Sequence, residues 1–124
     1  MSAVDALVAQ LQAQRLQWVD VAPGVRMRID TPSQFRAARI AMGLRARDGD
    51  AVVAELVPLM REWEGITGAF LLGPAVGSAD PVPFDARLLA MLCADRPEWV
   101  GKLGAAALDQ AAAARAQIET ASGN

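Results

Sequence analysis

The stretch QWVDVAPGVRMRIDTP, residues 17–32, contains the pattern that decides the fold. Apolar and polar residues alternate on both sides of Pro23-Gly24, a dipeptide that is typical of turns. In the segment after this dipeptide, residues 25–30, one face would be apolar and the other would carry arginines. The residues of the apolar face are Val25, Met27 and Ile29. The alternation predicts a β-hairpin over residues 17–30 with one apolar face.

Helical spacing of apolar residues precedes and follows this hairpin. An amphipathic helix is predicted over residues 3–15, on which four apolar residues would form one stripe: Val4, Leu7, Val8 and Leu11. A pair of helices is predicted over residues 32–63. Thr31 and Gln34 would form the capping box that starts this pair, and Pro58 would kink or break its second helix.

Two apolar stripes characterise the helical pair. The first helix carries Phe35, Ala38 and Met42, with Ala37, Ile40, Ala41 and Leu44 beside them. The second helix carries Val53, Leu56, Val57 and Met60, with Trp63 three residues further on. Both stripes follow the helical period, so each is expected to face the core.

The C-terminal half begins with a long loop over residues 64–83, whereas ordinary connections have about 4 to 6 residues. A Leu-rich helix is predicted over residues 84–94. The last helix is Ala-rich and is predicted over residues 96–120, with Asp95 as its cap and only a thin apolar stripe. Residues 121–124 are predicted to be a disordered tail.

Together these elements predict one mainly α-helical α+β domain over residues 1–124. A small N-terminal hairpin would pack on four or five helices, and a long Ala-rich helix would end the chain. No apolar run reaches the roughly 18 to 20 residues that a membrane span needs, and the N-terminus lacks the pattern of a secretory signal. We therefore expect a cytoplasmic protein without membrane contact.

Side chains that commonly carry catalysis are scarce. The chain has no histidine, and Cys93 is its only cysteine, so neither a metal site nor an activated thiol is expected. Paired carboxylates remain, at Asp48 with Asp50 and at Glu62 with Glu64. Helix capping explains the first pair, and a solvated helix end explains the second. We expect a protein without enzymatic activity, cofactor or metal.

Arginines gather between residues 26 and 47, where Arg26 and Arg28 would share one strand face. Nucleic acid binding would call for a basic chain or a recognition motif. The net charge is −2, the isoelectric point is about 5.0, and no such motif is present. A solvated face or a docking patch for an acidic partner is favoured, and nucleic acid is not an expected partner.

Three short motifs occur in a characteristic order: GVRMRIDTPSQF, then WEGIT at the end of a predicted helix, then PVPF before a Leu-rich helix. Over residues 17–108 this order resembles the small tail assembly chaperones of long-tailed bacteriophages. The matching residues are Trp63, Gly65, Ile66, Pro81, Val82, Pro83 and Phe84. The chain departs from the family pattern at FLLGPAVGSAD, residues 70–80, where the family often has a shorter turn.

The resemblance implies a non-enzymatic chaperone in the cytoplasm of the bacterial host. It would bind the helical tape measure protein, help to recruit tail tube subunits during tail morphogenesis, and be absent from the mature virion. Candidate partner-binding residues are Trp63, Gly65, Ile66, Pro83, Phe84, Trp99, Arg26 and Arg28. The two tryptophans and Phe84 would either shape or line the binding surface, since tryptophan is enriched at interface hot spots.

Three alternatives stay open from the sequence. The protein is either such a chaperone or a small structural virion component, for example a head–tail connector or a tail-completion protein. The Ala-rich last helix would pair either with itself or with the client protein. Residues 69–79 would either fold on the core as a lid or form an apolar surface for a partner.

Overall fold

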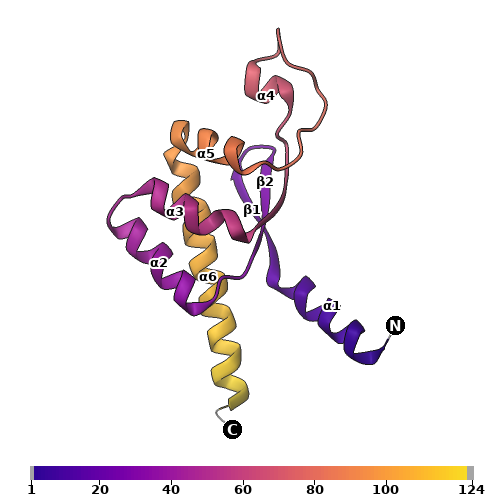
Figure 1. Ribbon diagram of the computed structural model, residues 1–124, viewed down its shortest axis with the longest axis vertical. Coiled ribbons are helices and arrows are strands. Elements are labelled where there is room, and N and C mark those ends of the chain that lie inside the picture. The colour runs from indigo at the N-terminus through magenta and orange to yellow at the C-terminus, as the bar shows by residue number, and fades with distance from the viewer. Residues whose placement is uncertain (1, 123–124) are drawn as a thin grey trace.

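The computed structural model describes residues 2–122 as helices around a small sheet (Figure 1). The elements in chain order are α1 (Ala3–Arg15), β1 (Leu16–Ala22), β2 (Val25–Asp30), α2 (Gln34–Arg45), α3 (Gly49–Leu56), η1 (Val57–Leu59), β3 (Met60–Glu64), α4 (Gly68–Leu72), α5 (Ala86–Asp95) and α6 (Pro97–Ser122). The predicted α+β class is confirmed: the fold is mainly helical, with the hairpin near the N-terminus and the long Ala-rich helix at the end.

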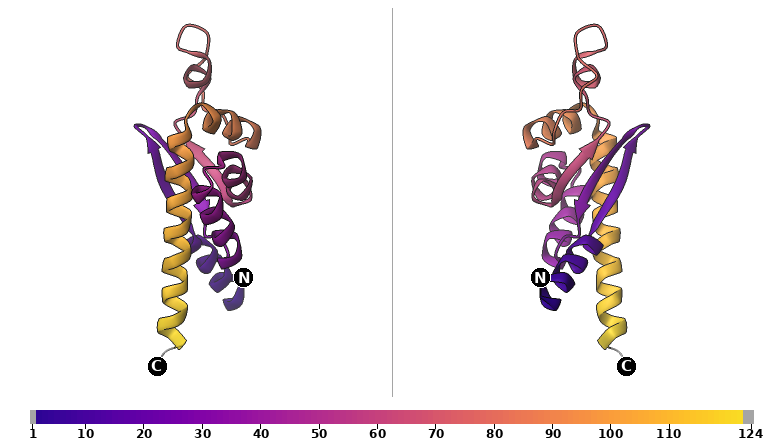
Figure 2. Two further views of the ribbon diagram at one scale, coloured as in Figure 1. Left: turned by 90° about the vertical axis from the view of Figure 1, so that its left-hand side faces the viewer. Right: turned by 90° about the vertical axis from the view of Figure 1, so that its right-hand side faces the viewer.

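The sheet of the described residues is antiparallel, with the strand order β1-β2-β3. β1 and β2 are the predicted hairpin. Their turn places Gly24 at a φ of 77°, a conformation that glycine adopts without steric cost. The alternate residues Val25, Met27 and Ile29 are buried, as the pattern predicts. α6 packs against β1 of the hairpin (Figure 2).

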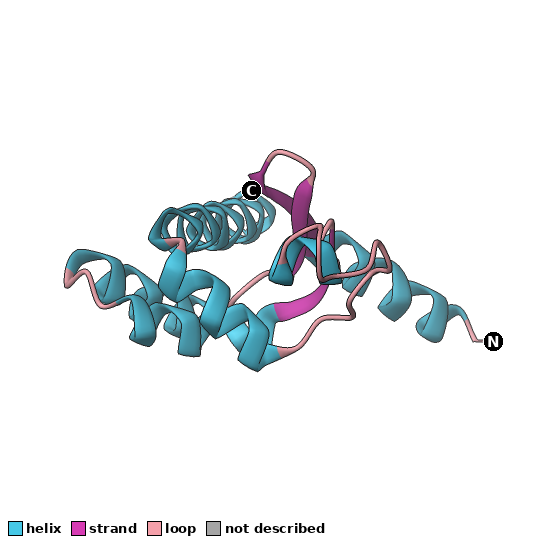
Figure 3. Cartoon of the chain, turned by 90° about the horizontal axis from the view of Figure 1, so that it is seen from above, coloured by secondary structure: helices cyan, strands magenta, loops and turns pink. Residues whose placement is uncertain are grey.

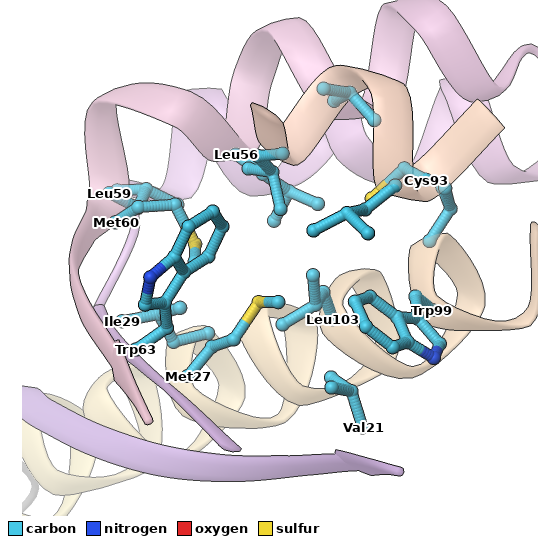
Figure 4. Packing of buried hydrophobic residues seen from close by; sticks show 14 of the residues in the cluster. Val21, Met27, Ile29, Leu56, Leu59, Met60, Trp63, Cys93, Trp99 and Leu103 are labelled. Carbon is cyan, nitrogen blue, oxygen red and sulfur yellow. The ribbon is translucent and has the colours of Figure 1, made fainter. Parts of the chain in front are cut away.

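The core lies between the sheet, α3, α5 and the first half of α6. Trp63 and Trp99 lie near its two ends, with Met27 and Leu103 between them (Figure 4). All four side chains are buried. Because full burial of one apolar side chain contributes about 1.5–3 kcal/mol, this row of side chains holds the sheet firmly to α6.

The predicted helical pair over residues 32–63 is wrong in its last part, because Met60–Glu64 forms strand β3. Pro58 breaks the helix, as predicted. α3 ends at Leu56, and the next three residues form η1, a turn of 3-10 helix that contains the proline. The chain then becomes extended and pairs with β2.

A β-bulge explains why β3 has a helical pattern in the sequence. Its pairing with β2 advances by one residue on β2 and by two on β3, which leaves Arg61 as the extra residue. Met60 and Trp63 are therefore both buried although they are three positions apart. A spacing of three is also the spacing of a helical stripe, so the two patterns coincide here.

The predicted capping box at Thr31 is wrong as well. Ser33 caps α2, and its hydroxyl accepts a hydrogen bond from an amide of the first turn. The Thr31 hydroxyl donates to the Arg15 carbonyl instead, which keeps Thr31 in line with the hairpin. Gln34 is not part of a box either, because its side-chain amide donates to the carbonyl of Ala111 on α6.

α2 turns a different side to the core from the one predicted. The stripe of Phe35, Ala38 and Met42 is exposed. The buried residues are Ala37, Ile40 and Gly43. A Cβ on Gly43 would lie 2.7 Å from Cγ2 of Val52, so α2 and α3 approach each other at this glycine. This close approach fixes which side of α2 is buried.

The helices of the C-terminal half differ from the prediction mainly at their ends. α5 begins two residues later than predicted, and the Asp85 carboxylate caps it. Asp95 is the last residue of α5 rather than the cap of the next helix. The predicted disordered tail, 121–124, is wrong for its first two residues, which are helical. Residues 123 and 124 lie outside the described part of the chain.

Two helices extend away from the core. α1 is the predicted amphipathic helix, but none of its described residues is buried, and it points away from the other elements (Figure 3). The second half of α6 also extends beyond the core, and Ile118 there is exposed. In the described part of the chain, no helix combines the length and the apolar character that crossing a bilayer requires.

Candidate partner-binding surface

Trp63, the tryptophan of the WEGIT motif, is held in the core by β3. Its indole Nε1 donates a hydrogen bond of 2.7 Å to the carbonyl oxygen of Val82. Phe84 packs edge-on against the indole, with 5.1 Å between the ring centroids. Trp63 thus joins WEGIT to PVPF, the two motifs that flank the long loop.

The two residues that follow β3 fix the start of the loop. Gly65 has a φ of 90°, and a Cβ on it would overlap the carbonyl oxygen of Gly24 in the hairpin turn. Only glycine fits at this close approach. Ile66 is buried, and its carbonyl accepts a hydrogen bond of 2.8 Å from the Val82 amide. Both residues therefore position the base of the loop.

The loop is closed at its base, where its outgoing and returning segments meet. Thr67 and Pro81 form an antiparallel bridge. Slightly further along, the two segments touch so closely that a Cβ on Gly77 would overlap the backbone of Gly68. These contacts hold the outer part of the loop in one orientation.

α4, the short helix of the loop, is fastened to the core by Phe70. The Phe70 ring stacks on that of Trp99, with centroids 6.1 Å apart and planes 25° apart. The Arg96 guanidinium lies 5.1 Å from the Phe70 ring centroid and 5.3 Å from that of Trp99, and adds a cation–π contact. Trp99 is 2% exposed, so it supports α4 and has little surface of its own for a partner.

The tip of the loop, residues 72–76, is apolar and exposed. Leu72 is 66% exposed and Val76 is 78% exposed, and the proline and alanine between them are exposed too. No charged residue occurs over residues 65–79. The tip projects beyond the other elements in Figures 1 and 2. The base of the loop thus packs on the core, and its apolar tip is accessible to a partner.

Arg26 and Arg28 lie on the outer face of the sheet, opposite to the buried side chains of β2. Arg26 stands 4.2 Å from the ring centroid of Trp18 and bonds Glu64 at 2.6 Å, and Arg28 bonds Glu62 at 3.1 Å. The hydrogen bond between Arg26 and Glu64 raises the pKa of the arginine and lowers that of the glutamate. These ion pairs reduce the positive charge that would attract an acidic partner.

The structure therefore divides the predicted partner-binding residues into four groups. Trp63, Ile66 and Trp99 are buried, Phe84 is half-buried, and Gly65 and Pro83 are exposed. The buried and half-buried side chains shape the loop base and do not line an open surface. Arg26 and Arg28 form a separate, ion-paired patch.

A groove of about 910 Å³ lies between the α2–α3 turn, α3, α5 and the start of α6. Its lining is largely apolar and includes Cys93, Val53 and Val100. Burial raises the pKa of Cys93 to about 11, so the thiol is protonated at neutral pH and is a poor nucleophile. Over residues 2–122, no three His, Cys, Asp or Glu side chains are grouped to hold a metal ion.

Sequence reasoning left the tip undecided and missed two other exposed apolar faces, those of α1 and α2. The signal for the tip was present, because an uncharged stretch of this length is unusual in a surface loop. The two helical stripes gave no such signal, because an apolar stripe is more often buried than exposed. Comparison of the chain with protein-family models, with curated proteins and with solved structures found no match.

Proposed function

We propose that this protein is a phage or prophage tail assembly chaperone that works in the cytoplasm of the bacterial host. It binds the tape measure protein and helps to recruit tail tube subunits during tail morphogenesis. One observation carries the proposal: residues 72–76 present an exposed apolar tip on a loop whose two ends are fixed by the WEGIT and PVPF motifs.

The size of the tip suits a reversible contact with an apolar helix face. Leu72 and Val76 are its two large apolar side chains, and burying each contributes about 1.5–3 kcal/mol before the costs of association. This free energy supports transient binding and allows release. Because the base of the loop is fastened to the core, little conformational entropy is lost when the tip binds.

A permanent place in the virion is less well supported by the same surface. Obligate interfaces bury about 2,000 Å² or more and are markedly apolar. A tip with two large exposed side chains is small by that measure. Analysis of purified particles distinguishes the two functions, because a connector or tail-completion protein is present in stoichiometric amounts and a chaperone is absent.

The direct test is co-expression with the tape measure protein from the same phage or prophage genome. The wild-type chain is expected to keep the client soluble. Leu72→Glu combined with Val76→Glu is expected to abolish that effect, because two charges then occupy the apolar contact. The matched control is Ala105→Glu with Ala112→Glu, two exposed positions on α6 that receive the same charges.

Circular dichroism of all variants separates loss of binding from loss of folding. The proposal fails if the client is no more soluble with the wild-type chain than without it. The role of the tip fails separately if the tip variant and the α6 control keep the client soluble equally well.

A further inference from the structure

α1 is a well-formed helix that packs on almost nothing. The Ser2 hydroxyl accepts from the Asp5 amide and the Asp5 carboxylate accepts from the Ser2 amide, so the helix start is fully capped. No described residue of α1 is buried. The exposed fractions of its apolar stripe are 68% for Val4, 55% for Leu7, 45% for Val8 and 52% for Leu11.

The C-terminal end of α1 is fixed, and this gives the stripe a defined direction. The Arg15 guanidinium donates to the Thr31 carbonyl at 2.7 Å and pairs with Asp30 at 3.2 Å, and the Thr31 amide donates to the Arg15 carbonyl at 3.0 Å. These contacts therefore fix the direction in which α1 extends from the hairpin. A helix of 13 residues is marginal in water without tertiary packing, so a partner is expected to cover the stripe.

The stripe is complementary to itself. When two such helices pack antiparallel about a two-fold axis between positions 7 and 8, Val4 lies opposite Leu11 of the other copy and Leu7 lies opposite Val8. Every contact then joins one leucine to one valine, a larger side chain against a smaller one. We propose that α1 is a dimerisation helix, which packs antiparallel against α1 of a second copy of this chain.

Charge favours this partner. Over residues 3–15 the only charged side chains are Asp5 and Arg15. In the two-fold arrangement Asp5 lies opposite Gln10 of the other copy, so no like charges face each other. The contact between the two stripes therefore avoids the cost of burying charges, which would be high for a helix with many of them.

A groove beside the C-terminal end of α1 would hold part of the second helix. A groove of about 760 Å³ separates α1 and β1 from the second half of α6, and Leu11, Ala113, Ala114 and Ile118 are among its lining residues. A partner helix in this groove would contact α1 on one side and the small alanines of α6 on the other. The α6 stripe, for which the sequence left self-pairing open, thus becomes one wall of the same interface.

The size of the contact predicts a reversible dimer. α1 has 13 residues and is about 20 Å long. With a face about 10 Å wide, the α1 pair and the two α1–α6 contacts together bury roughly 1,200 Å², the low end for specific interfaces. We expect dissociation in the micromolar range. This inference does not rest on the proposed function.

Disulfide trapping tests the register. In a Cys93→Ala background, chains with Val4→Cys and chains with Leu11→Cys are oxidised mildly, first separately and then as a mixture. The mixture is expected to give a cross-linked dimer at least about tenfold faster, because positions 4 and 11 are opposed while two copies of either position are about 10 Å apart along the helix axis. Cross-linking that is equally fast for either variant alone, or absent in the mixture, would overturn the proposal.

Sedimentation tests the interface without cysteines. Leu7→Glu is expected to raise the dimer dissociation constant at least tenfold, while Ala9→Glu, on the opposite side of α1, leaves it within about twofold. Both variants should fold normally, since α1 packs on little in the monomer. A wild-type chain that stays monomeric at about 1 mM, or equal effects of the two substitutions, would refute the inference.

Discussion

The indole of Trp63 donates a hydrogen bond of 2.7 Å to the carbonyl oxygen of Val82, 19 positions later in the chain. The bond connects the end of β3 to the segment that returns from the long loop. It lies in a partly buried position between β3 and Phe84, where water competes weakly for the Val82 carbonyl. The bond therefore acts together with the Thr67–Pro81 bridge to fix the base of the loop.

Replacement of Trp63 by phenylalanine should destabilise the protein by about 1–3 kcal/mol, because the Val82 carbonyl loses its donor while an aromatic ring remains against Phe84. Urea denaturation followed by circular dichroism measures the change. Trp18→Phe, on the outer face of the sheet, is the control and should cost less. Equal midpoints for the wild type and Trp63→Phe would show that the hydrogen bond contributes nothing.

Gly65→Ala should prevent stable folding, or lower the free energy of unfolding by more than about 3 kcal/mol. The substitution combines a φ of 90° with overlap between the new Cβ and the Gly24 carbonyl. Gly73→Ala separates the two causes, because Gly73 has a φ of 92° but open space around its Cβ position. Only the conformational cost of about 1–3 kcal/mol is expected there. If the two variants melt alike, the close approach is not the cause.

The Cys93 thiol should react about 100-fold more slowly with a disulfide reagent at pH 8 in the folded protein than in urea. Its pKa is about 11 in the fold and 9.0 ordinarily, and only the thiolate reacts. The pH dependence of stability has a definite sign. Below pH 9 the thiol is neutral in both states, and between pH 9 and 11 only the unfolded thiol ionises, so stability falls as the pH rises.

Cys93→Ala provides the measurement of that pH dependence. The difference in free energy of unfolding between the wild type and this variant should shrink as the pH rises from 9 to 11. Arginine and lysine titration affects both proteins alike and cancels in the difference. A difference that stays constant over this range would contradict a raised pKa for Cys93.

Asp85 should contribute to stability at neutral pH and lose that contribution in acid. The Arg87 guanidinium, together with the amides at the start of α5, lowers the pKa of Asp85 to about 2 from an ordinary 3.8. The contribution is therefore complete above about pH 4 and fades as the pH falls towards 2. Asp85→Asn keeps a good cap without the charge. The difference in melting temperature between this variant and the wild type should be largest near pH 7 and vanish near pH 2.

The elements that were predictable from the sequence are those that local patterns determine. The hairpin follows from strict alternation around Pro23-Gly24, and the break at Pro58 follows from the missing amide. β3 was not predictable in the same way. Its burial pattern depends on a bulge at Arg61, and the bulge arises only when β3 pairs with β2 far back in the chain.

The apolar stripes of the helices also show what the sequence alone does not determine. A period of 3.6 reveals that α1 and α2 each have an apolar side, but not what that side meets. On α2, the close approach of Gly43 to Val52 turns Phe35 and Met42 outwards. For the candidate site, WEGIT and PVPF located both ends of the loop. The division between its packed base and exposed tip depends on the stacking of Phe70 on Trp99, which a sequence pattern does not encode.

The closed base of the loop makes the tip an interchangeable module. Thr67 and Pro81 are already paired, so the loop between them has fixed ends. These ends do not move when the residues between them change. Loop-closure entropy rises only by about 0.6 kcal/mol for each doubling of length, so longer and shorter loops are tolerated. Substitutions, insertions and deletions over residues 72–76 can therefore change the exposed apolar surface while the core keeps its fold, which makes this segment a suitable place to graft a foreign peptide.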